Sequence, residues 1–407
     1  MTEAIRLIHT GDLHIGVQNY GRMDSATGYH TRLKDFLSTL DKLVDYAVSN
    51  ETDAVLICGD VFKNREPDVT QQREFAKRIK RLADSGVFVY IIVGNHDLHN
   101  AAGKATSVEI YDVLDMPGVT VRRKPEIDVI RTKRGSLQVI ALPYLSPSNL
   151  SVEGTTIEEI SLDIRNKIGK MLEALVARMD RTLPTVVMSH FSLIGAAPGS
   201  EKSILMGREI MLPVSFFNRP EFDYVAFGHI HKHQVLWEEP PVVYCGSLDR
   251  VDFNEEKEEK GFVEVFLRRG EAQFEFVPLD TRPFKTLYID AREGDPYEKA
   301  LEAVEREDLK EAIVKLKVML PADKLSSLRE RELYRLLREK AFYVAGIEKQ
   351  ITSDNSRTRY PGINEQMDLE EAVAEYISKK EEYRPIQEKL LAMNKELIAE
   401  LKGEGIL

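Results

Sequence analysis

Val93-Gly94-Asn95-His96-Asp97 follows directly on the apolar run 87–92, which is rich in β-branched and aromatic residues. A continuous apolar run of this kind is typical of a strand buried in a parallel sheet. The strand ends at Gly94, and polar residues follow at its carboxyl end, where open α/β sheets place their chemistry. After a single strand, Asn-His-Asp is more often a polar turn than a catalytic site. The interpretation therefore depends on how the other strands end.

Length and composition limit the class of protein. The chain has 407 residues, enough for two or three domains, and its 43% hydrophobic and 30% charged residues are typical of a soluble globular protein. Cys58 and Cys245 cannot build a disulfide framework and suit a reducing cytoplasm. The sequence shows neither a signal peptide nor an apolar run near the ~20 residues of a membrane span, so we expect a cytoplasmic protein with no membrane partner. The net charge of −11 argues against strong DNA binding by the chain alone, although divalent cations and local basic clusters offset part of it.

Strands and helices alternate through the first 280 residues, an order that indicates a doubly wound α/β layer. The predicted strands lie at 5–9, 53–58, 87–92, 136–142, 185–188, 223–227, 241–245, 261–267 and 272–277. The predicted helices lie at about 32–48, 71–85 and 156–179.

The composition changes near residues 280–283, and we expect four parts along the chain. They are residues 1–280, a smaller α/β unit at 281–350, a polar linker at 351–366 and a pair of helices at 367–407. The helix pair has apolar residues at helical spacing but little of its own part to pack against. Folding back and docking on another protein are about equally supported by this pattern.

Five strand ends carry residue types that bind metal ions. They are Asp12 with His14, Asp60, Asn95 with His96 and Asp97, His190, and His229 with His231. Polar groups gathered at one sheet edge need partners, and a metal supplies a partner for all of them. Carboxylate, imidazole and amide ligands without cysteine favour manganese, iron or zinc over magnesium or calcium. Seven candidate ligands exceed one tetrahedral ion, so two ions about 3.5–4 Å apart that share Asp60 fit better.

These motifs resemble those of the calcineurin-like metallophosphoesterases, and their spacing is closest to the SbcD nucleases of double-strand-break repair. The motifs are Gly11-Asp12-Leu13-His14, Gly59-Asp60, Gly94-Asn95-His96-Asp97, Ser189-His190 and Gly228-His229-Ile230-His231, with supporting stretches at 246–247, 252–255 and 260–262. The resemblance covers about residues 1–280 and implies a core of two sheets flanked by helices. By size and order, residues 281–350 resemble the family's DNA-contacting capping domain. By position and pattern, residues 367–407 resemble its ATPase-binding helix pair.

The resemblance also implies a role for each site residue. One ion would be held by Asp12, His14, Asp60 and His231, and the second by Asp60, Asn95, His190 and His229. His96 would protonate the leaving oxygen, and Asp97 would orient its ring. Lys63 stands where many members have His or Asp. We treat Lys63 and Ser247 as candidate substrate contacts, although the pattern favours a solvated loop residue for Lys63.

The sequence thus predicts a DNA nuclease with two divalent ions, for which Mn²⁺ is the expected metal, that cuts DNA ends or hairpins in double-strand-break repair. Its expected partners are DNA, an SbcC-type ATPase bound by the C-terminal helices, and a second copy of the chain in a homodimer through helices within 32–115. One alternative is a metallophosphoesterase acting on a small phosphodiester or phosphomonoester, which the trailing domains disfavour. The other is an end-binding scaffold for the ATPase, which the complete ligand set disfavours.

Overall fold

The computed structural model describes residues 3–99, 103–146, 156–197, 210–352 and 369–403, together with the single residues 150, 152, 154, 199 and 367. The contacts within the chain divide it into two units. The first unit is Met1–Leu287, Ala303–Leu316 and Glu330–Ile347, and the second is Tyr288–Glu302, Lys317–Arg329 and Glu348–Leu407. Apart from its first two residues, the expected linker at 351–366 lies outside the described residues.

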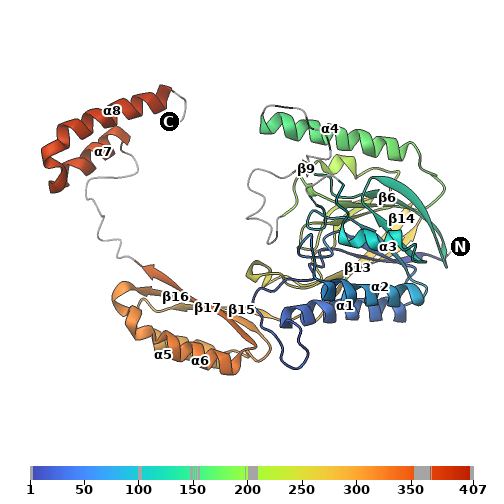
Figure 1. Cartoon of the computed structure of the whole chain (residues 1–407), viewed down its shortest axis with the longest axis horizontal. Helices are drawn as coiled ribbons and strands as arrows, with labels where there is room; N and C mark the ends of the chain where they lie inside the picture. Colours follow the sequence, from blue (N-terminus) through green and yellow to red (C-terminus); the bar gives the residue numbers. More distant parts are fainter. Residues whose placement is uncertain are drawn as a thin grey trace. The chain divides into compact units, whose positions relative to one another are not determined.

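Two six-stranded sheets form the frame of the first unit (Figure 1). The first sheet has the order β14-β13-β1-β2-β3-β4, in which β1 to β4 run parallel and β13 runs antiparallel to β1. Its strands are β1 (Ile5–Thr10), β2 (Ala54–Cys58), β3 (Phe88–Ile92), β4 (Val119–Arg122), β13 (Gly261–Arg268) and β14 (Glu271–Pro278).

The second sheet has the order β11-β12-β10-β7-β6-β5, with parallel inner strands and antiparallel strands at both edges. Its strands are β5 (Glu126–Thr132), β6 (Gly135–Leu142), β7 (Thr185–His190), β10 (Tyr224–Gly228), β11 (Gln234–Glu238) and β12 (Pro241–Tyr244). The short strands β8 (Ser192–Leu193) and β9 (Met211–Leu212) pair separately.

Helices cover the outer face of each sheet, because their apolar stripes need a surface to pack on. Helices α1 (Thr31–Ser49) and α2 (Val69–Asp84) share an apolar core with the first sheet, and α4 (Ile157–Val176) shares one with the second. A third core contains residues of both sheets, among them Leu56 and Val186. Figure 1 shows α1 and α2 on one side of the paired sheets and α4 on the other.

This layering confirms the two flanked sheets that the resemblance implied. It corrects the single doubly wound layer that we inferred from the order of strands and helices. A strand buried on both faces has the same apolar pattern whether it packs on a helix or on another sheet. The pattern therefore could not show that the chain crosses from one sheet to the other after β4.

A three-stranded sheet with the order β15-β16-β17 follows. It contains β15 (Phe284–Asp290), β16 (Ile313–Pro321) and β17 (Tyr343–Thr352), and the helices of this stretch are α5 (Pro296–Arg306) and α6 (Glu330–Lys340). Near the C-terminus, α7 (Leu369–Ser378) and α8 (Gln387–Gly403) contact each other. The remaining short helices are Ser107–Glu109, α3 (Ile110–Val113), Val214–Phe216, Phe253–Glu255, Ala322–Leu328 and Glu381–Ile386. The fourfold division of the sequence stays a prediction.

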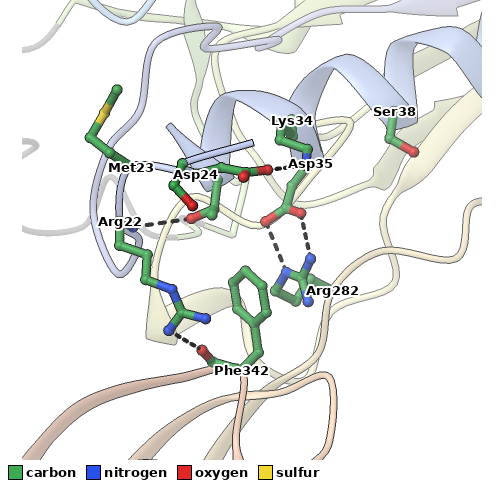
Figure 2. Close-up of a pocket in the computed structure, with 10 residues that line it drawn as sticks. Arg22, Met23, Asp24, Lys34, Asp35, Ser38, Arg282 and Phe342 are labelled. Atoms are coloured by element: carbon green, nitrogen blue, oxygen red, sulfur yellow. Dashed lines mark hydrogen bonds and ion pairs between the residues drawn. The ribbon is translucent and has the colours of Figure 1, made fainter. Parts of the chain in front are cut away.

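Within the first unit, Asp35 of α1 anchors the segment that begins near Arg282 (Figure 2). Nε and Nη2 of Arg282 donate to the two carboxylate oxygens of Asp35 at 2.9 and 2.8 Å. The Cζ atom of Arg282 lies 3.4 Å from the ring centroid of Phe342, whose carbonyl accepts a hydrogen bond from Arg22. These contacts border a pocket of about 480 Å³.

Among the described helices, none is long and apolar enough to cross a lipid bilayer.

Candidate metal centre

The predicted site residues come together where strands of both sheets end. Asp12 and His14 follow β1, Asp60 follows β2, and Asn95 and His96 follow β3, all in the first sheet. In the second sheet, His190 ends β7, and His229 and His231 follow β10. We expected one sheet edge, and the structure instead places the site where the carboxyl ends of two facing sheets meet.

At four positions in these loops the backbone has a positive φ angle, a conformation that residues other than glycine rarely adopt. Asp12, His14, Asp60 and His229 have φ angles of 50°, 43°, 51° and 93°. Such conformations cost roughly 1–3 kcal/mol each and occur where the surrounding structure fixes a functional residue. The absence of a side chain at Gly94 lets the loop after β3 lie close to Asp60, because a Cβ atom there would overlap the carboxylate of Asp60.

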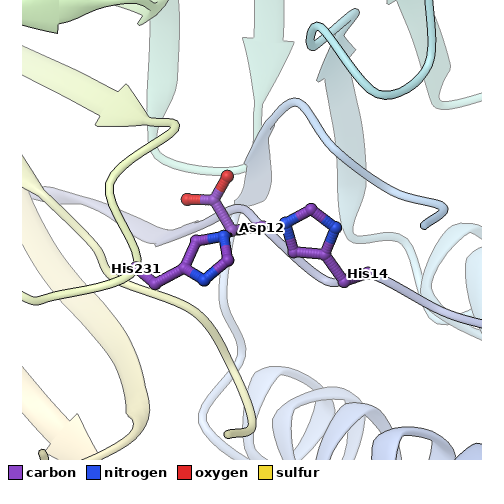
Figure 3. Close-up of side chains that lie close together, drawn as sticks. All are labelled: Asp12, His14 and His231. Atoms are coloured by element: carbon purple, nitrogen blue, oxygen red, sulfur yellow. Dashed lines mark hydrogen bonds between the residues drawn. The ribbon is translucent and has the colours of Figure 1, made fainter. Parts of the chain in front are cut away.

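One group of candidate ligands contains Asp12, His14 and His231 (Figure 3). Each offers a ligand atom within 4.8 Å of the others, and the Nε2 atoms of the two histidines are 2.8 Å apart. Nδ1 of His231 donates to Oε1 of Glu255 at 2.8 Å, which leaves a lone pair on its Nε2 atom. One backbone group holds the Asp12 carboxylate: the nitrogen of His229 lies 2.9 Å from both carboxylate oxygens, and its N–H is shared between them.

Asp60 connects this group with a second one. Its Oδ2 atom lies 3.7 Å from Nε2 of His14, and its Oδ1 atom lies 3.4 Å from Nε2 of His190. The side-chain oxygen of Asn95 lies 2.9 Å from Nε2 of His190 and 3.0 Å from Nδ1 of His229. Asp60 thus directs one oxygen to each group, as a carboxylate shared by two ions would.

The contacts of the two ring nitrogens of His190 show whether a cation fits between this ring, Asn95 and Asp60. Nδ1 of His190 donates to the carbonyl of Cys58 at 2.6 Å, so in the neutral ring the Nε2 lone pair faces the oxygens of Asn95 and Asp60. Acceptors that face one another in a buried site require a proton or a cation between them. Burial disfavours the charged ring, but the Asp60 carboxylate outweighs it and the pKa of His190 rises to about 9. The donor set therefore fits a divalent cation.

The carboxyl groups of the two aspartates take up a proton in different pH ranges. Burial raises the pKa of Asp12 to about 6, while its histidine neighbours act in the opposite direction. Burial also disfavours the charged form of Asp60, but His190 and His14 outweigh it and hold its pKa well below the usual value. Asp60 is therefore the permanent anion at the centre of the site.

His96 lies beside this centre and is also within 4.8 Å of ligand atoms of His14 and Asp60. Its Nδ1 atom contacts the carbonyl of Lys63 at 3.0 Å, and its backbone N–H donates to Asp60 at 2.8 Å. Burial lowers the pKa of its ring.

Asp97 holds backbone instead of orienting the His96 ring. Its carboxylate accepts hydrogen bonds from the N–H groups of Val61, Phe62 and Gly94 at 3.0–3.3 Å. This corrects the expected role. Asp97 ties the loop after β2 to the loop after β3, because its buried carboxylate accepts from backbone N–H groups of both. The carbonyl of Lys63 holds the His96 ring instead.

The two candidate substrate contacts also differ from each other. Ser247 is buried, and its hydroxyl contacts the carbonyl of Asp249 at 2.9 Å and Glu255 at 3.3 Å. This corrects its assignment as a substrate contact, because its hydroxyl is used inside the protein. Lys63 is half-buried and lines an open pocket of about 570 Å³ together with Arg65, Asn95, His96 and His99.

Residues 5–233, more than half of the chain, match the family model of the calcineurin-like phosphoesterases. The chain belongs to this family. It is 25% identical over 268 residues to the SbcD subunit of the nuclease SbcCD from Escherichia coli K12, with 62% of each chain covered. It is 26% identical over 319 residues to the SbcD subunit of the same nuclease from Rhodobacter capsulatus, covering 74% of this chain and 76% of that protein.

The chain is also 24% identical over 316 residues to the DNA double-strand break repair protein Mre11 of Haloferax volcanii, covering 76% of this chain and 60% of that protein. It thus spans about three fifths of the length of the E. coli and Haloferax relatives. Family membership confirms the expected enzyme class of this phosphoesterase, a hydrolase of phosphoester bonds.

The residues that hold the candidate ligand His231 in place were not identified from the sequence. Glu255 contacts His231, and Lys260 lies 2.9 Å from Glu255. Both residues lie in stretches that we noted only as part of the resemblance. They stand in the charged stretch 254–260, where nothing in the sequence distinguishes these two buried residues from their more exposed charged neighbours.

Proposed function

We propose that this phosphoesterase is a manganese-dependent DNA nuclease with two ions at the junction of its sheets. The observation that carries the proposal is the position of Asp60, which directs one oxygen to each group of candidate ligands. The first ion would bind Asp12, His14, Asp60 and His231, and the second Asp60, Asn95, His190 and His229. Nitrogen and oxygen donors without sulfur suit Mn²⁺.

When bound, the two ions would activate a water molecule and stabilise the charge that develops on the phosphate. His96 supplies the proton for the leaving oxygen, since its ring lies at the border of the open pocket and of the ligand groups. The carbonyl of Lys63 holds Nδ1 of this ring, which directs Nε2 away from that carbonyl. An entering phosphate anion would favour the protonated ring, because opposite charge nearby offsets the effect of burial.

The pocket beside His96 supports a polymeric substrate. Lys63 and Arg65 line it together with His99 and one acidic residue, Glu66, so that two cationic groups extend beyond the proposed ions. A DNA strand carries further phosphates on either side of the bond that is cut, and cationic side chains bind them. A small phosphate ester would leave this part of the pocket without a charged ligand.

The proposal includes partners and parts of the chain beyond the site. Residues 1–280 form the nuclease domain and residues 281–350 a capping domain that contacts DNA. Residues 367–407 bind an SbcC-type ATPase, and Met393 and Leu397 on α8 are exposed as such a contact requires. A homodimer would form through the exposed Ile110, Val113 and Leu114 at α3.

A nuclease assay on the full chain tests the proposal. With Mn²⁺, wild type should cut linear and hairpin DNA, Asp60→Asn should abolish cutting, and Glu264→Gln should cut normally. Glu264 is a suitable control, since it is a buried carboxylate paired with Arg6 at 3.1 Å, outside the candidate site. Hydrolysis of a chromogenic phosphodiester without any cutting of DNA would point to the small-ester enzyme. If Asp60→Asn left DNA cutting unchanged, the proposal would be wrong.

A further inference from the structure

Lys260 is a buried ammonium group behind the proposed metal centre. Its side chain is 0% exposed. Nζ lies 2.9 Å from Oε2 of Glu255, 2.8 Å from Oε2 of Glu258 and 3.0 Å from the carbonyl oxygen of His231. An ammonium group has three N–H donors, and each of them has an oxygen acceptor here. Lys260 therefore holds the backbone of a candidate ligand and the carboxylate beside it at the same time.

Glu255 links Lys260 to the imidazole ring of His231. Its Oε1 atom accepts the Nδ1 hydrogen of His231 at 2.8 Å. Its Oε2 atom is approached by Lys260, by the backbone N–H of Val251 at 2.9 Å and by the hydroxyl of Ser247 at 3.3 Å. A carboxylate with donors at both oxygens is fixed in position.

The hydrogen bond to Glu255 determines which ring nitrogen of His231 carries the lone pair. With its Nδ1 hydrogen bound to Glu255, the ring keeps the tautomer whose Nε2 atom carries the lone pair, and that atom lies 2.8 Å from Nε2 of His14. Metal-binding histidines generally donate their other N–H to a carboxylate or carbonyl, which orients the ring and makes it a stronger ligand. The group that faces Nδ1 of His231 is the Glu255 carboxylate, and Lys260 contacts the other oxygen of this carboxylate.

We propose that Glu255 and Lys260 are positioning residues that set the affinity of the ion bound by His231. They act through His231, from the side of the ring opposite the ion. The inference rests on the proposed two-ion function and deepens it. It assigns the stretch 255–260 a role in loading the centre with metal.

Metal titration of the full chain tests this inference without DNA. Mn²⁺ binding to the metal-free protein is measured by calorimetry for wild type, Glu255→Gln and the control Glu264→Gln. In Glu255→Gln the amide NH₂ must face either the donors Lys260 and Val251 or Nδ1 of His231. Either orientation breaks the arrangement. We expect one of the two ions to bind at least about tenfold more weakly, while the other ion and the control remain as in wild type.

The outcomes separate this inference from the proposed function. Unchanged affinity for both ions in Glu255→Gln would overturn the role of Glu255 and Lys260 and leave the nuclease proposal standing. A wild-type protein that binds no Mn²⁺ would overturn the proposed function itself. A second measurement needs no variant to fold: the ¹⁵N shifts of the His231 ring in the metal-free wild type. They should report hydrogen on Nδ1, and hydrogen on Nε2 alone would contradict the inference.

Discussion

The Nε2 atoms of His14 and His231 lie 2.8 Å apart, although the two residues are 217 positions apart in the chain. Because Glu255 accepts the Nδ1 hydrogen of His231, the Nε2 atom of that ring presents a lone pair. Asp12 completes this group within 4.8 Å. Lone pairs and carboxylate oxygens gathered in a buried place are stable only with a proton or cation among them. This relationship is the physical basis of the proposed metal centre.

Replacing His96 should separate proton transfer from metal binding. We expect His96→Ala to cut DNA about 10²–10⁴-fold more slowly, the usual contribution of a general acid. Because the proposed ligand sets do not include His96, the variant should still bind two Mn²⁺ ions, which titration would check. His30→Ala is the matched control, since His30 caps α1 outside the candidate site. Loss of an ion from His96→Ala would make His96 a ligand instead, an assignment that its distance from His14 and Asp60 also permits.

Replacing Lys63 should weaken DNA binding with little effect on the chemical step. Lys63→Ala keeps the backbone carbonyl that holds His96 and removes only the ammonium group in the pocket. One lost phosphate contact should reduce the slope of log affinity against log salt by about 1, for every DNA sequence alike. Fluorescence anisotropy at several salt concentrations measures this slope. Lys133→Ala, at an exposed turn between β5 and β6, serves as control. An unchanged slope would mean that Lys63 is only a solvated loop residue.

Glu74 should make the stability of the fold sensitive to acid. Burial disfavours its charged form, but ion pairs with Lys77, Arg73 and Arg78 outweigh it and lower its pKa from 4.5 to about 2. A lowered pKa means that the folded state binds fewer protons than the unfolded state between these values. The stabilisation by Glu74 is therefore present above about pH 4.5 and is lost as the pH falls toward 2.

Unfolding in denaturant at several pH values checks this prediction. Glu74→Gln should be less stable than wild type at pH 7, and the difference should shrink steadily as the pH falls below 4.5. A difference between the two proteins that stayed constant over this range would contradict the prediction.

The candidate ligands could be found from the sequence because each follows a recognisable strand. Apolar runs such as 87–92 mark the strands, and parallel strands bring their carboxyl ends to a common edge. The strands predicted at 5–9, 53–58 and 185–188 are present, at 5–10, 54–58 and 185–190, and their polar ends meet. Strands β4, β5 and β11 of the two sheets were missed, because each is partly exposed and lacks a long continuous apolar run.

The supports of the ligands could not be predicted in the same way. Asp97 follows His96 directly, so adjacency suggested a contact with its ring, whereas the direction of the side chain takes it to the N–H groups of Val61 and Phe62. Likewise, Ser247 follows a strand as the ligands do, yet its hydroxyl points inward to Glu255. Strand ends can be found from local patterns, but the direction of a side chain in a loop depends on tertiary contacts.

Anomalous diffraction from crystals of the full chain grown in Mn²⁺ tests the central claim most directly. We expect two peaks, one among Asp12, His14, Asp60 and His231 and the other among Asp60, Asn95, His190 and His229. Crystals of Asp60→Asn should lose at least one of them. No manganese peak at this junction of the two sheets, with strong peaks elsewhere on the protein, would contradict the account.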